Sequence, residues 1–291
     1  MLFDSTFLSK LEYLSLVSRR VFRGSLFAQR RTMQFGSGIE FADHREYAAG
    51  DDLRYLDWNI YARHGEYLLK RFQEEQDLHV YFLLDCSQSM AFGDPCKFDL
   101  ARQLVAALAY VALADLERIA VVAFTDRIIA DFPLTRGKAR ILSLLDFLEN
   151  LPTQGVDTDL GQSMREFLRR KQRSGLAVVV SDLFAPKGFE PGIDQLRHRR
   201  YEPHVIQLHD RKEADPDFLG DVELYDVENA STRKVTVTES NLRTYRRLFQ
   251  EYQQRVEVYC RNYGLGCTQA TTSIAFDDLV LRMMRAAGAV A

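Results

Sequence analysis

The stretch LLDCSQSM at residues 83 to 90 places an acid and two serines at alternate positions directly after an apolar run. A threonine lies in the loop GVDTDLG at 155–161, and an aspartate follows the apolar run at 176–180. Carboxylate and hydroxyl oxygens suit a hard divalent cation, Mg²⁺ first and then Mn²⁺ or Ca²⁺. The sequence therefore predicts a metal site with oxygen ligands from Asp85, Ser87 and Ser89, from Asp182 after the second run, and from Asp157, Thr158 or Asp159 in the loop.

If the two serine hydroxyls bind the cation directly and the acids act partly through water, the cation is left incompletely neutralised. An incompletely neutralised cation attracts an anion from outside, such as a carboxylate of a partner protein. The alternative is that the serines only make hydrogen bonds in a turn after the strand. The placement of the threonine and the second aspartate at the ends of other elements favours the metal site.

The elements that must position these residues are strands and helices in alternation. Continuous apolar runs predict strands buried on both faces, at 80–84, 119–124, 176–180 and 205–208. Helical periodicity recurs between them, at 97–116, 137–150 and 158–171. We predict an α/β fold of the Rossmann-like type, with a mostly parallel sheet and helices on both faces. The short link to 127–132 predicts one antiparallel edge strand.

The flanking regions differ in character from this centre. Residues 1–77 are rich in charges and aromatic residues, which suggests an N-terminal extension or subdomain. Residues 78–240 hold the α/β pattern, with two short strands predicted at 222–227 and 234–238. Residues 241–291 are predicted to be a C-terminal helical segment, with helices at 241–263 and 276–287.

Composition excludes several classes of protein. A formal net charge of −3 gives no general attraction to nucleic acid, and the arginines between 19 and 31 are interpreted as a solvated face. The four cysteines show neither metal-binding spacing nor a secreted framework. No apolar run is long enough to span a membrane or to form a signal peptide. We expect an unexported, cytoplasmic protein.

Two regions resemble known families. The pattern Asp85-x-Ser87-x-Ser89, followed by Thr158 and Asp182, resembles the metal-ion-dependent adhesion site of von Willebrand factor A domains. The segment GSGIEFADHREYAAGDDLRYLDWNIYARHGEYLLKRFQEEQD is similar to the region before that domain in the bacterial domain of unknown function 58 family. The stretches REY, GDDLRYLDW, YAR and LLKRF carry this likeness.

The resemblance implies a von Willebrand factor A-like domain whose metal binds an acidic side chain of a client protein. It also implies a partner among the AAA+ ATPases of the MoxR type, for which such proteins act as adaptors. The charged and aromatic stretch could dock that ATPase through Arg45, Asp51, Asp52, Arg54, Asp57 and Trp58. The interpretation we favour from sequence is instead a buried network of ion pairs and rings that clamps the N-terminal segment to the domain.

An enzymatic alternative uses the same first acid. In a Mg²⁺-dependent phosphoryl-transfer enzyme, Asp85 would be the nucleophile. Dehalogenase-like phosphatases need a second acid two residues later, where this chain has Ser87, and the sequence shows no well-placed lysine. We therefore predict a non-catalytic interaction module with no catalytic residues.

Overall fold

The computed structural model describes residues 2–21, 35–36, 40–48, 50–73, 78–154, 158–170, 172–225 and 231–289. The side chains of the arginine-rich stretch at 19–31 and the residue Asp157 lie outside this description.

A six-stranded sheet forms the centre of the molecule, in the order β11-β8-β7-β4-β5-β6. Its strands are β4 (His79–Asp85), β5 (Arg118–Phe124), β6 (Ile128–Arg136), β7 (Leu176–Ser181), β8 (Glu202–His209) and β11 (Gly266–Thr271). Five strands are parallel, and β6 pairs with β5 in the antiparallel direction at the sheet edge. The predicted α/β class, the mostly parallel sheet and the antiparallel edge strand are confirmed.

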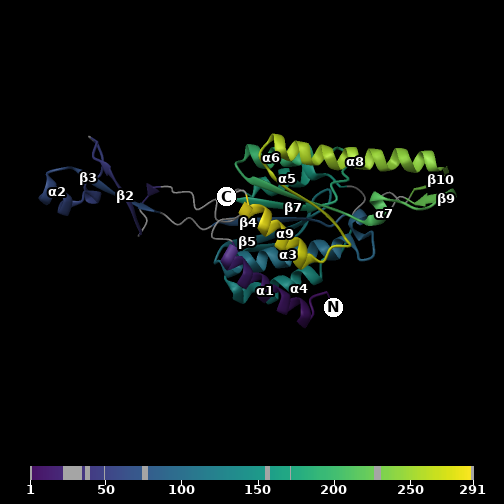
Figure 1. The fold of residues 1–291 in the computed structure, drawn as a ribbon, viewed down its shortest axis with the longest axis horizontal. Helices are drawn as coiled ribbons and strands as arrows, with labels where there is room; N and C mark the ends of the chain where they lie inside the picture. Colours follow the sequence, from purple (N-terminus) through teal and green to yellow (C-terminus); the bar gives the residue numbers. More distant parts are fainter. Residues whose placement is uncertain are drawn as a thin grey trace.

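Helices cover both faces of this sheet (Figure 1). One face packs against α1 (Ser5–Val21), α3 (Lys97–Ala114), α4 (Ile141–Glu149) and α9 (Phe276–Ala289). The other packs against α5 (Leu160–Arg169), α6 (Glu190–His198) and α8 (Glu239–Asn262). Since both faces are covered, every residue of β4 is buried, which explains its continuous apolar sequence. Among the described residues, no helix has the length and apolarity needed to cross a bilayer.

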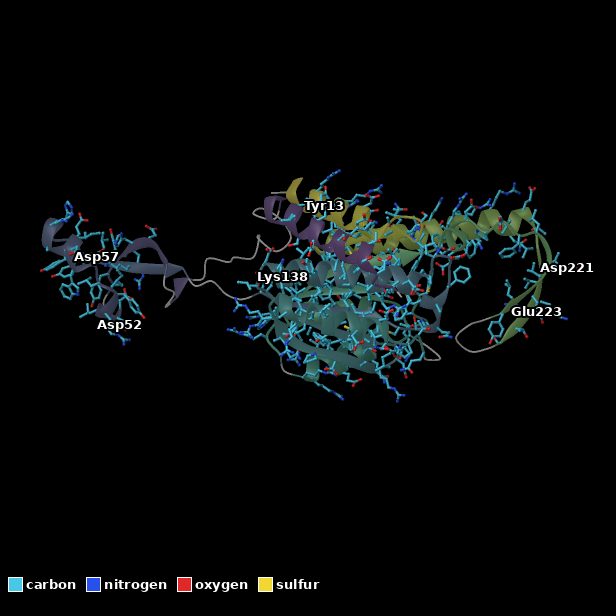
Figure 2. All side chains as sticks on the ribbon, turned by 90° about the horizontal axis from the view of Figure 1, so that it is seen from below. Tyr13, Asp52, Asp57, Lys138, Asp221 and Glu223 are labelled. Carbon is cyan, nitrogen blue, oxygen red and sulfur yellow. The ribbon has the colours of Figure 1, made fainter. Side chains whose placement is uncertain are left out.

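Short elements complete this body. The 3₁₀ turns η4 (Gln88–Ala91) and η5 (Lys138–Arg140) precede α3 and α4, and α7 (Arg211–Ala214) follows β8. The two short strands predicted at 222–227 and 234–238 are β9 (Gly220–Tyr225) and β10 (Thr232–Val237), and the structure pairs them as an antiparallel hairpin. Figure 1 shows this hairpin beyond one end of α8, and Figure 2 labels Asp221 and Glu223 on it.

Part of the N-terminal region forms a second, small sheet. It has the order β1-β3-β2 and consists of β1 (Phe35–Gly36), β2 (Glu40–Glu46) and β3 (Leu68–Gln73). Between β2 and β3 lie η3 (Leu53–Tyr55) and α2 (Trp58–His64). In Figure 1 these elements stand apart from the large sheet. We call residues 40–73 the β2–β3 unit.

The two flanking regions contribute to the body in ways that their sequences did not indicate. The helix α1 packs against α3 and α9, and its Leu11 and Leu14 are fully buried. One part of the predicted extension at 1–77 therefore packs on the large sheet, and another part forms the small sheet. The predicted C-terminal helical segment contains β11, which pairs in parallel with β8. The helices expected at 241–263 and 276–287 are α8 and α9, whereas β11 was not predicted, because GCTQAT lacks the apolar run of the inner strands.

Candidate functional site at the carboxyl end of the sheet

Asp85 is the last residue of β4 and is completely buried. Its Oδ1 accepts a hydrogen bond from the Ser87 backbone N–H (2.9 Å), and its Oδ2 accepts one from the Ser181 hydroxyl (2.5 Å). Burial, followed by the negative charge of Asp182, raises the pKa of Asp85 to about 6. The site is therefore short of positive charge around this carboxyl group.

The two serines of the motif share one hydrogen bond. The hydroxyls of Ser87 and Ser89 lie 3.1 Å apart and bond to each other across the start of the 3₁₀ turn η4. Ser87 is 2% exposed and Ser89 is half-buried. Because a hydroxyl oxygen has two lone pairs, each serine keeps capacity to bind a further ligand.

Asp182 follows β7, which is the neighbour of β4 in the sheet. It is 1% exposed, and its Oδ2 accepts a hydrogen bond from the Lys97 ammonium at 2.8 Å. Lys97 also donates to Glu213 Oε1 of α7 and is itself fully buried. Burial acts to lower the pKa of Lys97, but the charges and hydrogen bonds of Asp182 and Glu213 outweigh burial and raise it. The lysine is therefore held as a cation.

The backbone directly after Asp182 is in a conformation that few side chains adopt. Leu183 has a φ of 64° and is buried, which costs about 1 kcal/mol or more for a bulky residue. Its N–H donates to the Ser181 hydroxyl (2.8 Å), and its carbonyl accepts from the Tyr252 hydroxyl of α8 (2.5 Å). These bonds hold the turn that carries Asp182.

Thr158 lies just before α5, in the loop where the sequence predicted it. Its side-chain oxygen is buried and has no hydrogen-bond partner among the described residues. The residue lines a cavity of about 220 Å³ together with Asp126 after β5 and Lys187 after β7. A buried hydroxyl without a partner costs about 1–3 kcal/mol, so this oxygen is suited to a ligand that the protein itself does not supply.

The donor set fits a hard cation that takes oxygen ligands. Among the described residues, no three or more His, Cys, Asp or Glu side chains form a cluster that could hold a metal. Hydroxyls would have to supply the remaining ligands, and the buried, unpartnered Thr158 oxygen and the paired serine hydroxyls can do so. Mg²⁺ accepts such a set because it keeps several waters.

Three further residues complete the polar cluster around Asp85 and Asp182. The sequence placed Ser181 at a strand end without giving it a role, and it missed Lys97 and Glu213. The prediction that no well-placed lysine exists is wrong, because Lys97 reaches Asp182. No local pattern marks this lysine, since Asp182 is 85 residues and Glu213 is 116 residues away along the chain.

The charged stretch in the β2–β3 unit differs from the buried clamp that we favoured. Its ion pairs are local: Arg45 pairs with Asp51 (2.6 Å) and Arg54 with Asp52 (2.5 Å). The hydrogen bonds from Arg45, with one from the Ala48 backbone, lower the pKa of Asp51 to about 2. Figure 2 labels Asp52 and Asp57 within this unit.

The aromatic residues of the same stretch face solvent. Trp58 is 60% exposed, with Tyr61 edge-on at 6.1 Å between ring centroids, and Tyr61 stacks on Tyr67 at 4.7 Å. Asp57 is buried: it caps α2 by accepting from the Asn59 N–H (3.0 Å) and pairs with His44 (3.0 Å) and Lys70 (3.5 Å) of the same unit. The interpretation as a buried network is therefore wrong.

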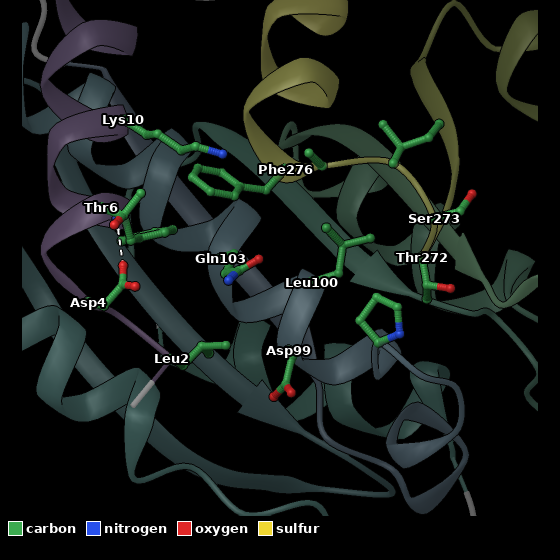
Figure 3. A pocket seen from close by; sticks show the side chains of 14 residues that line it. Leu2, Asp4, Thr6, Lys10, Asp99, Leu100, Gln103, Thr272, Ser273 and Phe276 are labelled. Carbon is green, nitrogen blue, oxygen red and sulfur yellow. Dashed lines mark hydrogen bonds between the residues drawn. The ribbon is translucent and has the colours of Figure 1, made fainter.

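A larger hollow of about 570 Å³ lies between α1, α3 and the loop before α9 (Figure 3). Lys10 at its rim is paired with Asp277 at 3.0 Å, and Gln103 and Phe276 line it. None of the five predicted metal ligands lines this hollow.

The fold and site define an α/β protein with a mixed, mostly parallel sheet and a buried acidic and hydroxyl cluster at the carboxyl ends of its strands. Residues 43–257 match the family model described as "Protein of unknown function DUF58", so the chain belongs to that family. An uncharacterized protein of Mycobacterium tuberculosis and one of Mycobacterium bovis are each 25% identical to it over 238 residues. These matches cover 80% of this chain and 75% of each relative.

Two solved structures are also similar. The conserved hypothetical protein BatB from Bacteroides thetaiotaomicron has 14% identity and a TM-score of 0.46, over 74% of this chain and all of BatB. An aerotolerance-related membrane protein from Bacteroides fragilis has 14% identity and a TM-score of 0.45, over 72% of this chain and 99% of its own. At these values, the function must be argued from the site itself.

Proposed function

We propose that this protein is a non-catalytic interaction module that binds a partner carboxylate through a divalent cation, Mg²⁺ first. Asp85, Ser87, Ser89, Thr158 and Asp182 would hold the cation, as the resemblance to a von Willebrand factor A adhesion site implies. The observation that carries the proposal is the Thr158 oxygen, buried without a partner among the described residues. When bound, the cation would offer a coordination position to a carboxylate from outside.

The environment of Asp85 disfavours the phosphoryl-transfer alternative. A nucleophile must reach the substrate, but Asp85 is fully buried and both of its oxygens accept hydrogen bonds within the protein. Lys97 supplies a lysine that the alternative requires, yet it is bound to Asp182 and Glu213. Turnover of a phosphate ester that disappears in Asp85→Asn would favour the enzyme.

The first experiment measures metal binding by titration calorimetry with MgCl₂ and MnCl₂. We expect Asp85→Ala and the double variant Ser87→Ala/Ser89→Ala to lose binding and keep their circular dichroism. Ser163→Ala is the matched control, because Ser163 is equally buried but its hydroxyl donates to the Thr125 carbonyl (2.9 Å). Unchanged metal affinity in both site variants would contradict the proposed ligands.

The partner class follows from the resemblance: a MoxR-type AAA+ ATPase, with an acidic residue of a client on the metal. The exposure of Trp58, Arg54 and Asp52 supports the β2–β3 unit as the docking surface for the ATPase. A purified MoxR-type ATPase from the same organism should bind the wild type and lose affinity for Trp58→Ala. Retention of that binding in EDTA would separate ATPase docking from the metal site, which needs its own carboxylate partner.

A further inference from the structure

Lys97 is the most unusual charged residue of the described chain because its side chain is completely buried. It begins α3, its backbone N–H donates to the Phe92 carbonyl (3.0 Å), and its ammonium bonds Asp182 and Glu213. Lys97 therefore connects three segments: the loop after β4 through its backbone, and the turn after β7 and α7 through its ammonium. A buried ion pair contributes little net stability after desolvation, so stability alone does not explain this arrangement.

We propose that Lys97 sets the charge of the metal site, and so its preference for a divalent cation, with Glu213 as its counter-charge. This inference rests on the proposed function, since it concerns the same cation. The carboxylates of Asp182 and Glu213 bond one ammonium, that of Lys97, and the buried carboxylate of Asp85 ends β4, the strand beside β7. With all four groups charged, the excess is two negative charges, which one divalent cation neutralises.

Lys97 contacts a proposed metal ligand, Asp182, and is not itself a ligand. Its ammonium contacts Asp182 Oδ2, whereas Asp182 Oδ1 accepts from the Phe184 N–H at 3.1 Å. Lys97 also lies 5.7 Å from the centroid of the Phe184 ring, which covers it. A cation this well shielded from solvent acts on the site through a low effective dielectric constant, and a change of one charge there is screened little.

A charge-setting lysine and a merely structural one predict opposite signs on substitution. Lys97→Gln retains a hydrogen-bond donor for the carboxylates but removes the positive charge. If Lys97 sets the charge, this variant should bind Mg²⁺ about tenfold more tightly, and Glu213→Gln should bind it about tenfold more weakly. The double variant restores the balance and should stay within about threefold of the wild type.

The trivalent ion Tb³⁺ gives a second readout. Because it carries one more charge than Mg²⁺, the ratio of Tb³⁺ to Mg²⁺ affinity should rise in Lys97→Gln and fall in Glu213→Gln. The control is Lys10→Gln, which removes the same charge from a lysine that is bound to Asp277 at 3.0 Å but is 41% exposed and lies outside the proposed site. Solvent screens that charge, so both affinities should change less than about twofold.

The experiment is titration calorimetry with Mg²⁺ and luminescence titration with Tb³⁺, on the full chain at pH 8. Weaker Mg²⁺ binding by both Lys97→Gln and the double variant, with intact circular dichroism, would overturn the inference and leave Lys97 a structural role. If Lys97→Gln does not fold, Glu213→Gln decides: Mg²⁺ affinity equal to that of the wild type overturns the inference. Absence of Mg²⁺, Mn²⁺ and Ca²⁺ binding by the wild type would instead refute the proposed function.

Discussion

Replacing Thr158 by valine should stabilise the metal-free protein and weaken the metal site at the same time. The buried Thr158 oxygen has no partner among the described residues, and such a group costs about 1–3 kcal/mol. Valine puts a methyl group in its place and removes that cost. We therefore expect the free energy of unfolding in EDTA to rise by about 1–2 kcal/mol, which raises the melting temperature by about 2–4 °C per kcal/mol.

The matched control is Thr272→Val. Thr272 is equally buried, but its hydroxyl donates to Asp210 Oδ2 at 2.6 Å. The same substitution there breaks a hydrogen bond to a charged acceptor and should lower the free energy of unfolding by about 1.5–3 kcal/mol. The two Thr→Val variants thus differ in the sign of their effect, because within the described part of the chain only the Thr272 hydroxyl has a partner.

The assay is urea denaturation of each variant in EDTA and in saturating MgCl₂. The wild type should gain stability from Mg²⁺, since a ligand that binds only the folded state stabilises it. Thr158→Val should gain less, because one cation ligand is lost. Loss of stability in Thr158→Val without metal would refute the reasoning, since it would show that the hydroxyl already has a partner in the metal-free protein.

Three further predictions concern pH, packing and the exposed surface. Burial lowers the pKa of His204 from 6.5 to about 4, so the unfolded chain takes up this proton first as the pH falls. The contribution of His204 to the free energy of unfolding should then decrease by about 1.4 kcal/mol per pH unit between pH 6.5 and 4. Because the raised pKa of Asp85 acts in the opposite sense, this contribution is measured as the difference between the denaturation curves of the wild type and of His204→Gln. Gly192→Ala in α6 would place a Cβ 2.5 Å from Leu160 Cγ of α5, and should lower both the melting temperature and Mg²⁺ affinity by displacing α5. An unchanged Mg²⁺ affinity would show that α5 does not position Thr158. Trp58→Ala should leave the melting temperature within about 1 °C, because the side chain is largely exposed, and a larger loss would mean that Trp58 packs against the body.

The sequence was sufficient to predict the inner strands of the central sheet, because a strand buried on both faces has a continuous apolar sequence. The continuous apolar runs that became β4, β5, β7 and β8 needed no information from the rest of the chain. The strand β11 has no continuous apolar sequence, since GCTQAT lies at the sheet edge and is only partly buried. Its place beside β8 follows from the packing of α8 and α9 on opposite faces of the sheet.

The chemistry divided in the same way. The sequence alone placed Asp85 at the end of a buried strand, with Ser87 and Ser89 close behind it, because the apolar run and the residue order are read directly from the chain. The 3₁₀ turn η4, which begins at Gln88, then brings the two hydroxyls within 3.1 Å. Only the tertiary structure decided that Lys97 lies against Asp182 and Glu213, since its ammonium joins segments brought together by the parallel strands and not by the chain. It also decided the exposure of Trp58: the neighbouring charges pair within the β2–β3 unit, as Arg45 does with Asp51, and the tryptophan ring stays 60% exposed.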